Sequence, residues 1–111
     1  MSTARNDILH GTLTVLVLKT LASEGLTHGY AIASYIQQVS GHLLRIEEGS
    51  LYPALRRMSR AGWLRSEVGR TETRRPATFY ALTPAGYRQL EEELARWACL
   101  RKGVSRVLAR T

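Results

Sequence analysis

The hydrophobic pattern of this chain changes its period twice, and this change constrains the fold more than any other feature. Up to about residue 62, apolar residues recur at helical spacing in segments 7–23, 27–39 and 50–61. Residues 63–68 and 77–82 then alternate between apolar and polar side chains, as strands do. From Thr83-Pro84, a favourable N-cap and first helical position, the helical period returns and continues to Leu108. The expected order is three helices, two strands and one long helix.

Small and turn-forming residues mark the expected ends of these elements. Thr27 is the expected N-cap of the second helix and Ser50 that of the third. With Ser50 as the cap, Pro53 lies in the first turn, where its missing N–H has no helical partner anyway. The polar and basic stretch 69–75 is suited to the loop of a hairpin between the two strands.

This order predicts a mainly α fold (α+β), a winged helix-turn-helix with a long C-terminal dimerisation helix. In such a fold the third helix enters the major groove of DNA, and the hairpin forms the wing. We expect residues 1–82 to form the DNA-binding domain and residues 83–111 the dimerisation helix. One domain core is consistent with a chain of 111 residues.

The third helical segment carries a basic face opposite its apolar stripe. The stripe contains Leu51, Leu55 and Met58, and the expected DNA-facing residues of the helix and wing are Tyr52, Arg56, Arg57, Arg60, Arg74 and Arg75. An outward arginine is usually only a solvated surface residue. Residues 56–75, however, contribute +5 of the net charge of +7. This concentration on the expected recognition helix and wing favours double-stranded DNA as the partner.

The last helical segment is longer than one compact winged helix can cover. Its 25 residues span about 37 Å at about 1.5 Å per residue. The apolar positions follow a heptad-like spacing, interrupted by Arg101: Tyr87, Leu90, Leu94, Trp97, Val104 and Leu108. This seam predicts a homodimer, whose two recognition helices lie roughly 34 Å apart and read an inverted repeat.

Trp97 lies in this expected seam and has two interpretations. It is either a packed interface side chain or part of a pocket at the dimer centre that binds a small aromatic effector.

Other features of the sequence argue against catalysis, metal binding and membrane insertion. The three histidines lack metal-ligand spacing, and the single Cys99 has no catalytic partner nearby in the sequence. We therefore expect no enzyme activity, no cofactor and no metal. The longest apolar run, Val15 to Leu18, is far too short to span a membrane, and the N-terminus does not resemble a signal peptide. A cytoplasmic location is the simplest interpretation.

Three segments together resemble the PadR family of bacterial transcriptional regulators: HGYAIASYIQQVSG, EEGSLYPALRRMSRAGWL and TRRPATFYALTPAGYRQLEEE. The details are similar to a compact subgroup with a single C-terminal helix, described as acidobacterial-type. The resemblance implies a dimeric winged-helix DNA-binding protein, most often a repressor. It implies DNA contacts at Tyr30, Ser50, Tyr52, Arg56 or Arg57, Arg74 and Arg75. Many members have a Lys-Tyr-Tyr-like run in the wing, and this chain has Phe79-Tyr80 instead.

Two functions stay open at this point. One is a sequence-specific DNA-binding regulator, and the other is a winged-helix module that docks proteins through its long helix without operator binding. The basic third helix and wing favour the first.

Overall fold

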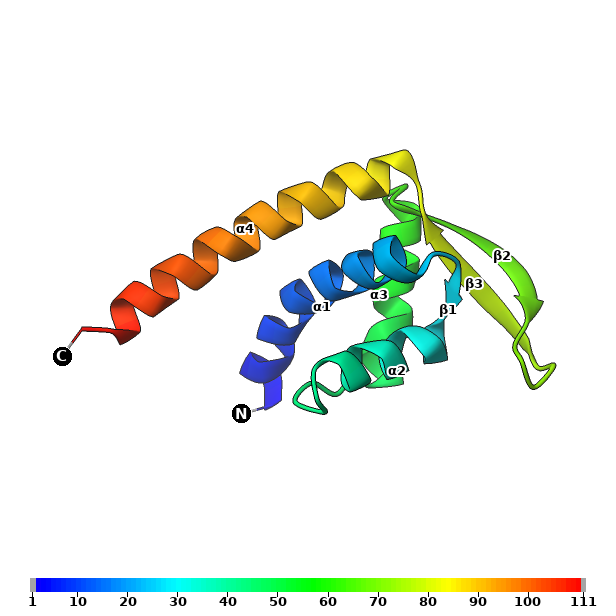
Figure 1. Ribbon diagram of the computed structural model, residues 1–111, viewed down its shortest axis with the longest axis horizontal. Helices are drawn as coiled ribbons and strands as arrows, with labels where there is room; N and C mark the ends of the chain where they lie inside the picture. Colours follow the sequence, from blue (N-terminus) through cyan, green and yellow to red (C-terminus); the bar gives the residue numbers. More distant parts are fainter. Residues whose placement is uncertain (1, 111) are drawn as a thin grey trace.

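The computed structural model describes residues 2–110, with side chains from residue 11 onward. In chain order the elements are α1 (Ser2–Glu24), β1 (Thr27–His28), α2 (Gly29–Val39), α3 (Glu48–Arg60), β2 (Leu64–Arg70), β3 (Pro76–Leu82) and α4 (Pro84–Leu108). Figure 1 shows the first three helices packed together, with the β2–β3 hairpin extending to one side and α4 passing α1 toward the other. This arrangement confirms the expected mainly α, winged-helix fold.

The hydrophobic core lies between the three N-terminal helices, the base of the hairpin and the first half of α4. Its fully buried side chains include Leu13, Leu18, Leu21, Ile32, Leu51, Leu55 and Met58. The apolar stripes expected for α1, α2 and α3 therefore meet in one cluster. The apolar residues Ile8 and Leu9, at the start of the first helical segment, lie outside the described side chains.

The sheet has three antiparallel strands in the order β1-β3-β2. Leu64 pairs with Leu82 at the base of the hairpin and Arg70 with Pro76 near its tip, so the loop covers residues 71–75 rather than 69–75. The strand β1 was not expected, because two residues are too few to show a period of two. It pairs Thr27 with Tyr80, which makes β3 the central strand.

Two expected helix starts were wrong. His28, not Thr27, caps α2: its Nδ1 accepts a hydrogen bond from the Ala31 N–H at 3.4 Å. Glu47, not Ser50, precedes α3, and its carbonyl accepts hydrogen bonds from the N–H groups of Ser50 and Leu51. The helix thus begins at Glu48, three residues before the start at Leu51 that Ser50 as a cap requires. Pro53 lies in the second turn of α3, where it removes one internal hydrogen bond.

The start of α4 agrees with the expectation and fixes this helix to the base of the hairpin. The Thr83 hydroxyl accepts a hydrogen bond from the Gly86 N–H at 3.1 Å and donates one to the Gly62 carbonyl at 2.6 Å. Gly86 packs directly against the carbonyl of Trp63. The direction in which α4 leaves the domain is therefore set by contacts with the residues that follow α3.

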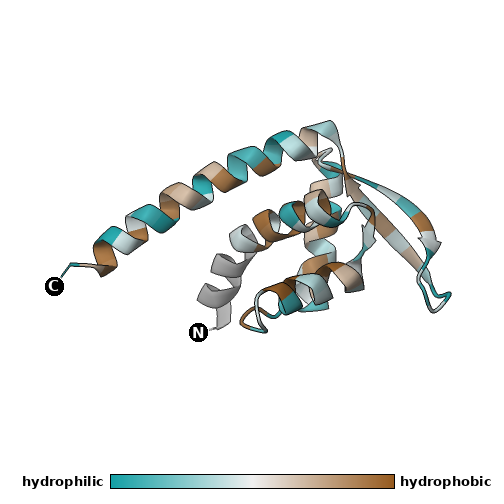
Figure 2. Cartoon of the chain, in the orientation of Figure 1, coloured by the Kyte–Doolittle hydropathy of each residue, from teal (hydrophilic) through white to brown (hydrophobic). Residues whose placement is uncertain are grey.

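Among the described residues, the buried side of α4 lies in its first half. Leu90 is 7% exposed and belongs to the core, whereas the C-terminal half projects past α1 (Figure 1). Figure 2 shows hydrophobic residues recurring along this projecting part between hydrophilic ones. The helix is thus amphipathic beyond the end of its own domain.

Candidate nucleic-acid interface

The helix α3 has one buried and one exposed face, as the sequence predicted. Leu51, Ala54, Leu55 and Met58 are buried, and the arginines at positions 56, 57 and 60 are exposed. The apolar residues hold the helix against α1 and α2, so the three guanidinium groups must point into solvent. Ser50 is half-buried in the first turn of the same helix.

The wing presents two further exposed arginines at its tip. Arg74 has a φ of +66°, a left-handed conformation that non-glycine residues rarely adopt. Several hydrogen bonds hold this turn, among them one from the Arg74 N–H to the Thr71 carbonyl at 2.8 Å and one from Arg70 Nη1 to the Arg74 carbonyl at 3.1 Å. The tip is therefore an ordered turn that carries Arg74 and Arg75 away from the domain.

A groove of about 680 Å³ separates the wing from the helices. It is lined by the N-terminus of α2, by Tyr52 of α3, by Tyr80 of β3 and by wing residues 71–78 apart from Arg74, with Glu72 as its acidic member. Tyr30 is 66% exposed and Tyr52 is 37% exposed. The structure thus brings Tyr30, Tyr52 and Arg75 to one concave surface.

Tyr80 was not selected as a site residue from the sequence. Its strand partners are Thr27 and Ser66, which place it in the middle of the sheet. Burial, and to a smaller extent the phenol of Tyr52, raise the pKa of Tyr80, while the guanidinium of Arg56 acts in the opposite direction. Its neighbours on the groove come from distant parts of the sequence. Two sequence signals pointed to it: the Phe79-Tyr80 pair stands in place of the family's aromatic run in the wing, and Tyr80 lies two residues before the core residue Leu82, on the same face of the strand.

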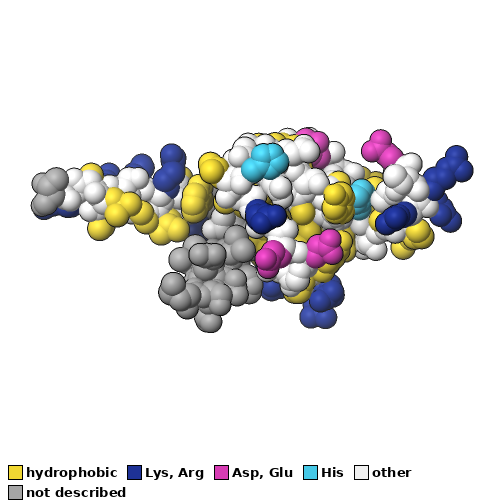
Figure 3. Space-filling view, turned by 90° about the horizontal axis from the view of Figure 1, so that it is seen from below, with side chains coloured by type: hydrophobic (Ala, Val, Ile, Leu, Met, Phe, Trp, Pro, Cys, Tyr) yellow, Lys and Arg dark blue, Asp and Glu magenta, His cyan; other side chains and the backbone are white. Residues whose placement is uncertain are grey.

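The arginines of this surface form no ion pair with any acidic side chain that the structure describes. The ion pairs among the described residues are Arg65–Glu67 at 3.2 Å and Arg96–Glu93 at 3.3 Å. No described acidic side chain pairs with an arginine of the exposed face of α3 or of the wing tip. In Figure 3, basic side chains gather at the tip of the wing. Such a surface can bind a polyanion.

A second exposed surface follows α4, and it differs in part from the expected seam. Its exposed large apolar side chains are Tyr87, Leu94, Trp97, Leu100, Val104, Val107 and Leu108. Leu90 was expected in this seam, but it packs in the chain's own core and is not available to a partner. Leu100 and Val107 were missed, because a strict heptad placed Arg101 on the stripe. Hydrophobic side chains line one edge of the projecting helix in Figure 3.

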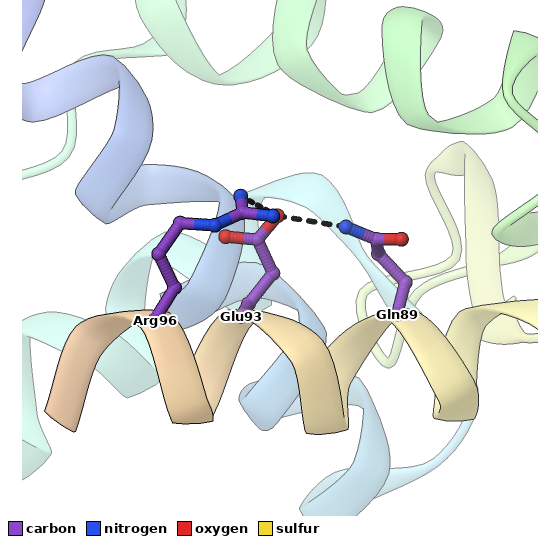
Figure 4. Close-up of polar contacts among 3 residues, drawn as sticks. All are labelled: Gln89, Glu93 and Arg96. Carbon is purple, nitrogen blue, oxygen red and sulfur yellow. Dashed lines mark hydrogen bonds and ion pairs between the residues drawn. The ribbon is translucent and has the colours of Figure 1, made fainter. Parts of the chain in front are cut away.

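Trp97 also lines a cavity of about 350 Å³ between α1 and α4. Gly11 and Val15 form its α1 side, and Glu93 lies at its α4 side with a side chain that is 13% exposed. Glu93 Oε2 accepts hydrogen bonds from Gln89 Nε2 at 2.8 Å and from Arg96 Nη1 at 3.3 Å. Figure 4 shows these three side chains leaving α4 on the same side. The carboxylate is therefore held in place within the helix.

The described residues offer no other obvious site chemistry. They contain no group of three His, Cys, Asp or Glu side chains that could hold a metal ion. No helix in the described part of the chain is long and apolar enough to cross a membrane.

Comparison with known proteins gives one consistent family. Residues 17–92 match the family described as "Transcriptional regulator PadR-like family". An uncharacterized 37.1 kDa protein in a transposon of Streptomyces fradiae is 48% identical over 81 residues, and the match covers 71% of this chain but 21% of that protein. This chain therefore corresponds to a small part of that relative.

Solved structures agree with this match over nearly the whole chain. A PadR family transcriptional regulator from Eggerthella lenta has a TM-score of 0.77 and 33% identity, covering 99% of this chain and 93% of that one. A transcriptional regulator from Clostridium thermocellum has a TM-score of 0.81 and 29% identity, covering 90% of this chain and 96% of that one.

Proposed function

Because the chain belongs to the PadR-like family of transcriptional regulators, we propose that it is a repressor that binds an inverted-repeat operator as a homodimer. DNA binding and transcriptional regulation are the activity of the family. The repressor mode, the operator symmetry and the dimer are our proposal. We place this activity in the cytoplasm, where the genome is accessible.

The observation that carries the proposal is the unpaired basic face of α3 beside the basic wing. The major groove of B-DNA is about 12 Å wide and admits one α-helix. The helix α3 presents exposed arginines opposite a fully buried stripe, and arginine is the side chain that pairs with guanine edges and with phosphates. We propose that Ser50 and Arg56 face the bases, and that Tyr30, Tyr52, Arg57, Arg60, Arg74 and Arg75 contact the backbone.

We propose that residues 1–82 form the DNA-binding domain and that residues 83–111 form the dimerisation helix. The apolar stripe of α4 supports this division, since it continues past the domain that it starts from. The proposed interface consists of Leu94, Trp97, Leu100, Val104 and Leu108, without Leu90. In a dimer with a two-fold axis between the two copies of α4, we expect the two recognition helices to lie roughly one turn of DNA apart, about 34 Å.

The first experiment is selection of bound fragments from the source genome, followed by footprinting of the best fragment. We expect a protected inverted repeat near a promoter. Binding should weaken on the order of a thousandfold between 50 and 200 mM salt for a dimer with about 6–8 phosphate contacts. Absence of enrichment over random DNA, with little salt-dependent binding, would favour the alternative of a protein-docking module without operator binding.

A second candidate activity is recognition of a small aromatic effector at Trp97. The cavity beside Trp97 supports it, because about 350 Å³ lies within the range of small-molecule pockets, roughly 300–1,000 Å³. Trp97 is 42% exposed and so offers a stacking surface. Titration with flat aromatic compounds should quench the fluorescence of Trp97, and a Trp97→Phe variant gives the background from Trp63. Equal quenching in both proteins would exclude this pocket.

A further inference from the structure

Tyr80 is an anchored side chain with an accessible hydroxyl. Its ring packs against the hydrophobic core, and its backbone is the central strand of the sheet. Its hydroxyl has no hydrogen-bond partner within the described chain. Because no described side-chain oxygen is both buried and unpartnered, this hydroxyl is accessible from outside. Tyrosine commonly combines a buried ring with a polar tip that seeks a partner outside. A phenol keeps its proton at neutral pH and can donate it, and burial is the main cause that raises the pKa of Tyr80 further.

Tyr52 is held beside Tyr80 by a glycine of another helix. A Cβ atom added at Gly29 would lie 2.8 Å from Cε1 and 3.0 Å from the hydroxyl oxygen of Tyr52. The absence of a side chain at Gly29 therefore leaves room for the Tyr52 ring against the first turn of α2. Gly29 thereby acts as a positioning residue for Tyr52.

The charges around the two hydroxyls favour an anion. Arg56 lies near enough to Tyr80 to act on its pKa, and Arg75 lines the same groove from the wing. Glu72 is the acidic side chain on the groove. His28 also lines it, but its Nδ1 already accepts the Ala31 N–H. Two fixed O–H donors beside two guanidinium groups match the non-bridging oxygens of a phosphodiester.

We propose that this groove binds one backbone phosphodiester of duplex DNA, with the hydroxyls of Tyr52 and Tyr80 as paired donors. The inference rests on the proposed DNA-binding function and adds a defined site to it. The phosphate between the wing and α3 would then be bound by two neutral donors, one fixed to the sheet and one fixed to α3. These two donors set how deeply α3 enters the major groove of the DNA, whatever the DNA sequence.

The test compares Tyr80→Phe and Tyr52→Phe with Tyr35→Phe on duplex DNA of arbitrary sequence and on the selected operator. Tyr35 is a matched control, since its hydroxyl lies 3.5 Å from Ser23 Oγ and does not line the groove. A hydrogen bond to a charged group corresponds to about tenfold or more in affinity. We expect each groove variant to lose about tenfold on both DNAs, with an unchanged salt slope because no charge is removed. The control should bind as the wild type does.

A scan with single methylphosphonate substitutions locates the site on the DNA. At one backbone position the neutral linkage should weaken the wild type about tenfold, whereas Tyr80→Phe should lose little more at that position. Gly29→Ala should lose as much DNA affinity as Tyr52→Phe. The double variant Gly29→Ala/Tyr52→Phe should bind DNA no more weakly than either of its single variants. If Tyr80→Phe and Tyr52→Phe bind duplex DNA as tightly as the wild type, the phosphodiester site is refuted. If the wild type itself binds no duplex, the DNA-binding function fails and this site fails with it.

Discussion

The three arginines of α3 share an exposed face, but their surroundings differ. Arg57 and Arg60 lie in the last turn of the helix, where a positive charge interacts favourably with the helix dipole. Arg56 lies earlier in the helix, and its guanidinium is near enough to Tyr80 to lower the pKa of that phenol. A structural explanation therefore exists for Arg57 and Arg60 that does not extend to Arg56. This difference makes Arg56 the better candidate for a base contact.

Replacement of Arg56 by alanine tests this assignment. If Arg56 pairs with a guanine edge, Arg56→Ala should cost about 1–3 kcal/mol of operator binding and relax the specificity at one position. Arg75→Ala should instead weaken binding to all sequences alike and lower the salt slope by about one. Competition binding with single-base operator variants measures both effects. Unchanged operator affinity of Arg56→Ala would mean that another face of α3 reads the DNA.

Gly86 is a residue whose replacement should damage the fold rather than the site. A Cβ atom there would overlap the backbone carbonyl of Trp63, which cannot move without shifting the base of the hairpin. We expect Gly86→Ala to lower the unfolding free energy by about 2–4 kcal/mol, typical of overpacking and displaced backbone. Gly49→Ala is the control, because a Cβ atom there meets nothing within 4 Å and alanine favours the helix. Thermal unfolding that ranks Gly86→Ala level with this control would contradict the packing argument.

Among the elements, those with local signals were predictable from the sequence, and those made by distant contacts were not. Thr83 and Pro84 marked the start of α4 correctly, since an N-cap and a first-turn proline act within a few residues. The prediction of Ser50 as the N-cap of α3 was wrong, because Glu47 caps the helix without any side-chain hydrogen bond. The strand β1 and the groove position of Tyr80 depend on pairing between Thr27 and Tyr80. No local pattern records a contact over that separation.

The N-cap of α4 joins two elements, so its loss should be felt by both. Thr83→Val keeps the shape of the side chain but removes its hydrogen bonds to the Gly86 N–H and to the Gly62 carbonyl. We expect a loss of about 1–2 kcal/mol in unfolding free energy, the usual magnitude of an N-cap. Thr78→Val is the matched control, since Thr78 is an exposed residue of β3. Chemical denaturation should separate the two variants; equal midpoints would show that this cap contributes nothing.

The shape of the whole molecule is set by α4. The chain measures 55 × 29 × 24 Å, and its radius of gyration of 15.1 Å exceeds the roughly 13 Å expected of a compact domain of this length. The excess comes from a helix that carries exposed apolar residues where it has no domain beneath it. A second copy of the chain would bury this stripe and at the same time present a second basic face to the DNA. Dimerisation and operator recognition are thus expected to be linked.

Aspartate substitutions on the two faces of α4 test this link. Leu100→Asp and Val104→Asp place a carboxylate on the exposed apolar stripe, where burial against a partner would be costly. Light scattering should give twice the chain mass of 12.4 kDa for the wild type and the single mass for these variants. Operator affinity should fall in the variants that do not dimerise, because one recognition helix keeps only half of the contacts. Lys102→Asp changes charge on the exposed polar side of the same helix and should leave the mass dimeric. A wild type that scatters as a monomer at micromolar concentration would refute the homodimer, and the stripe would then have to serve a different partner.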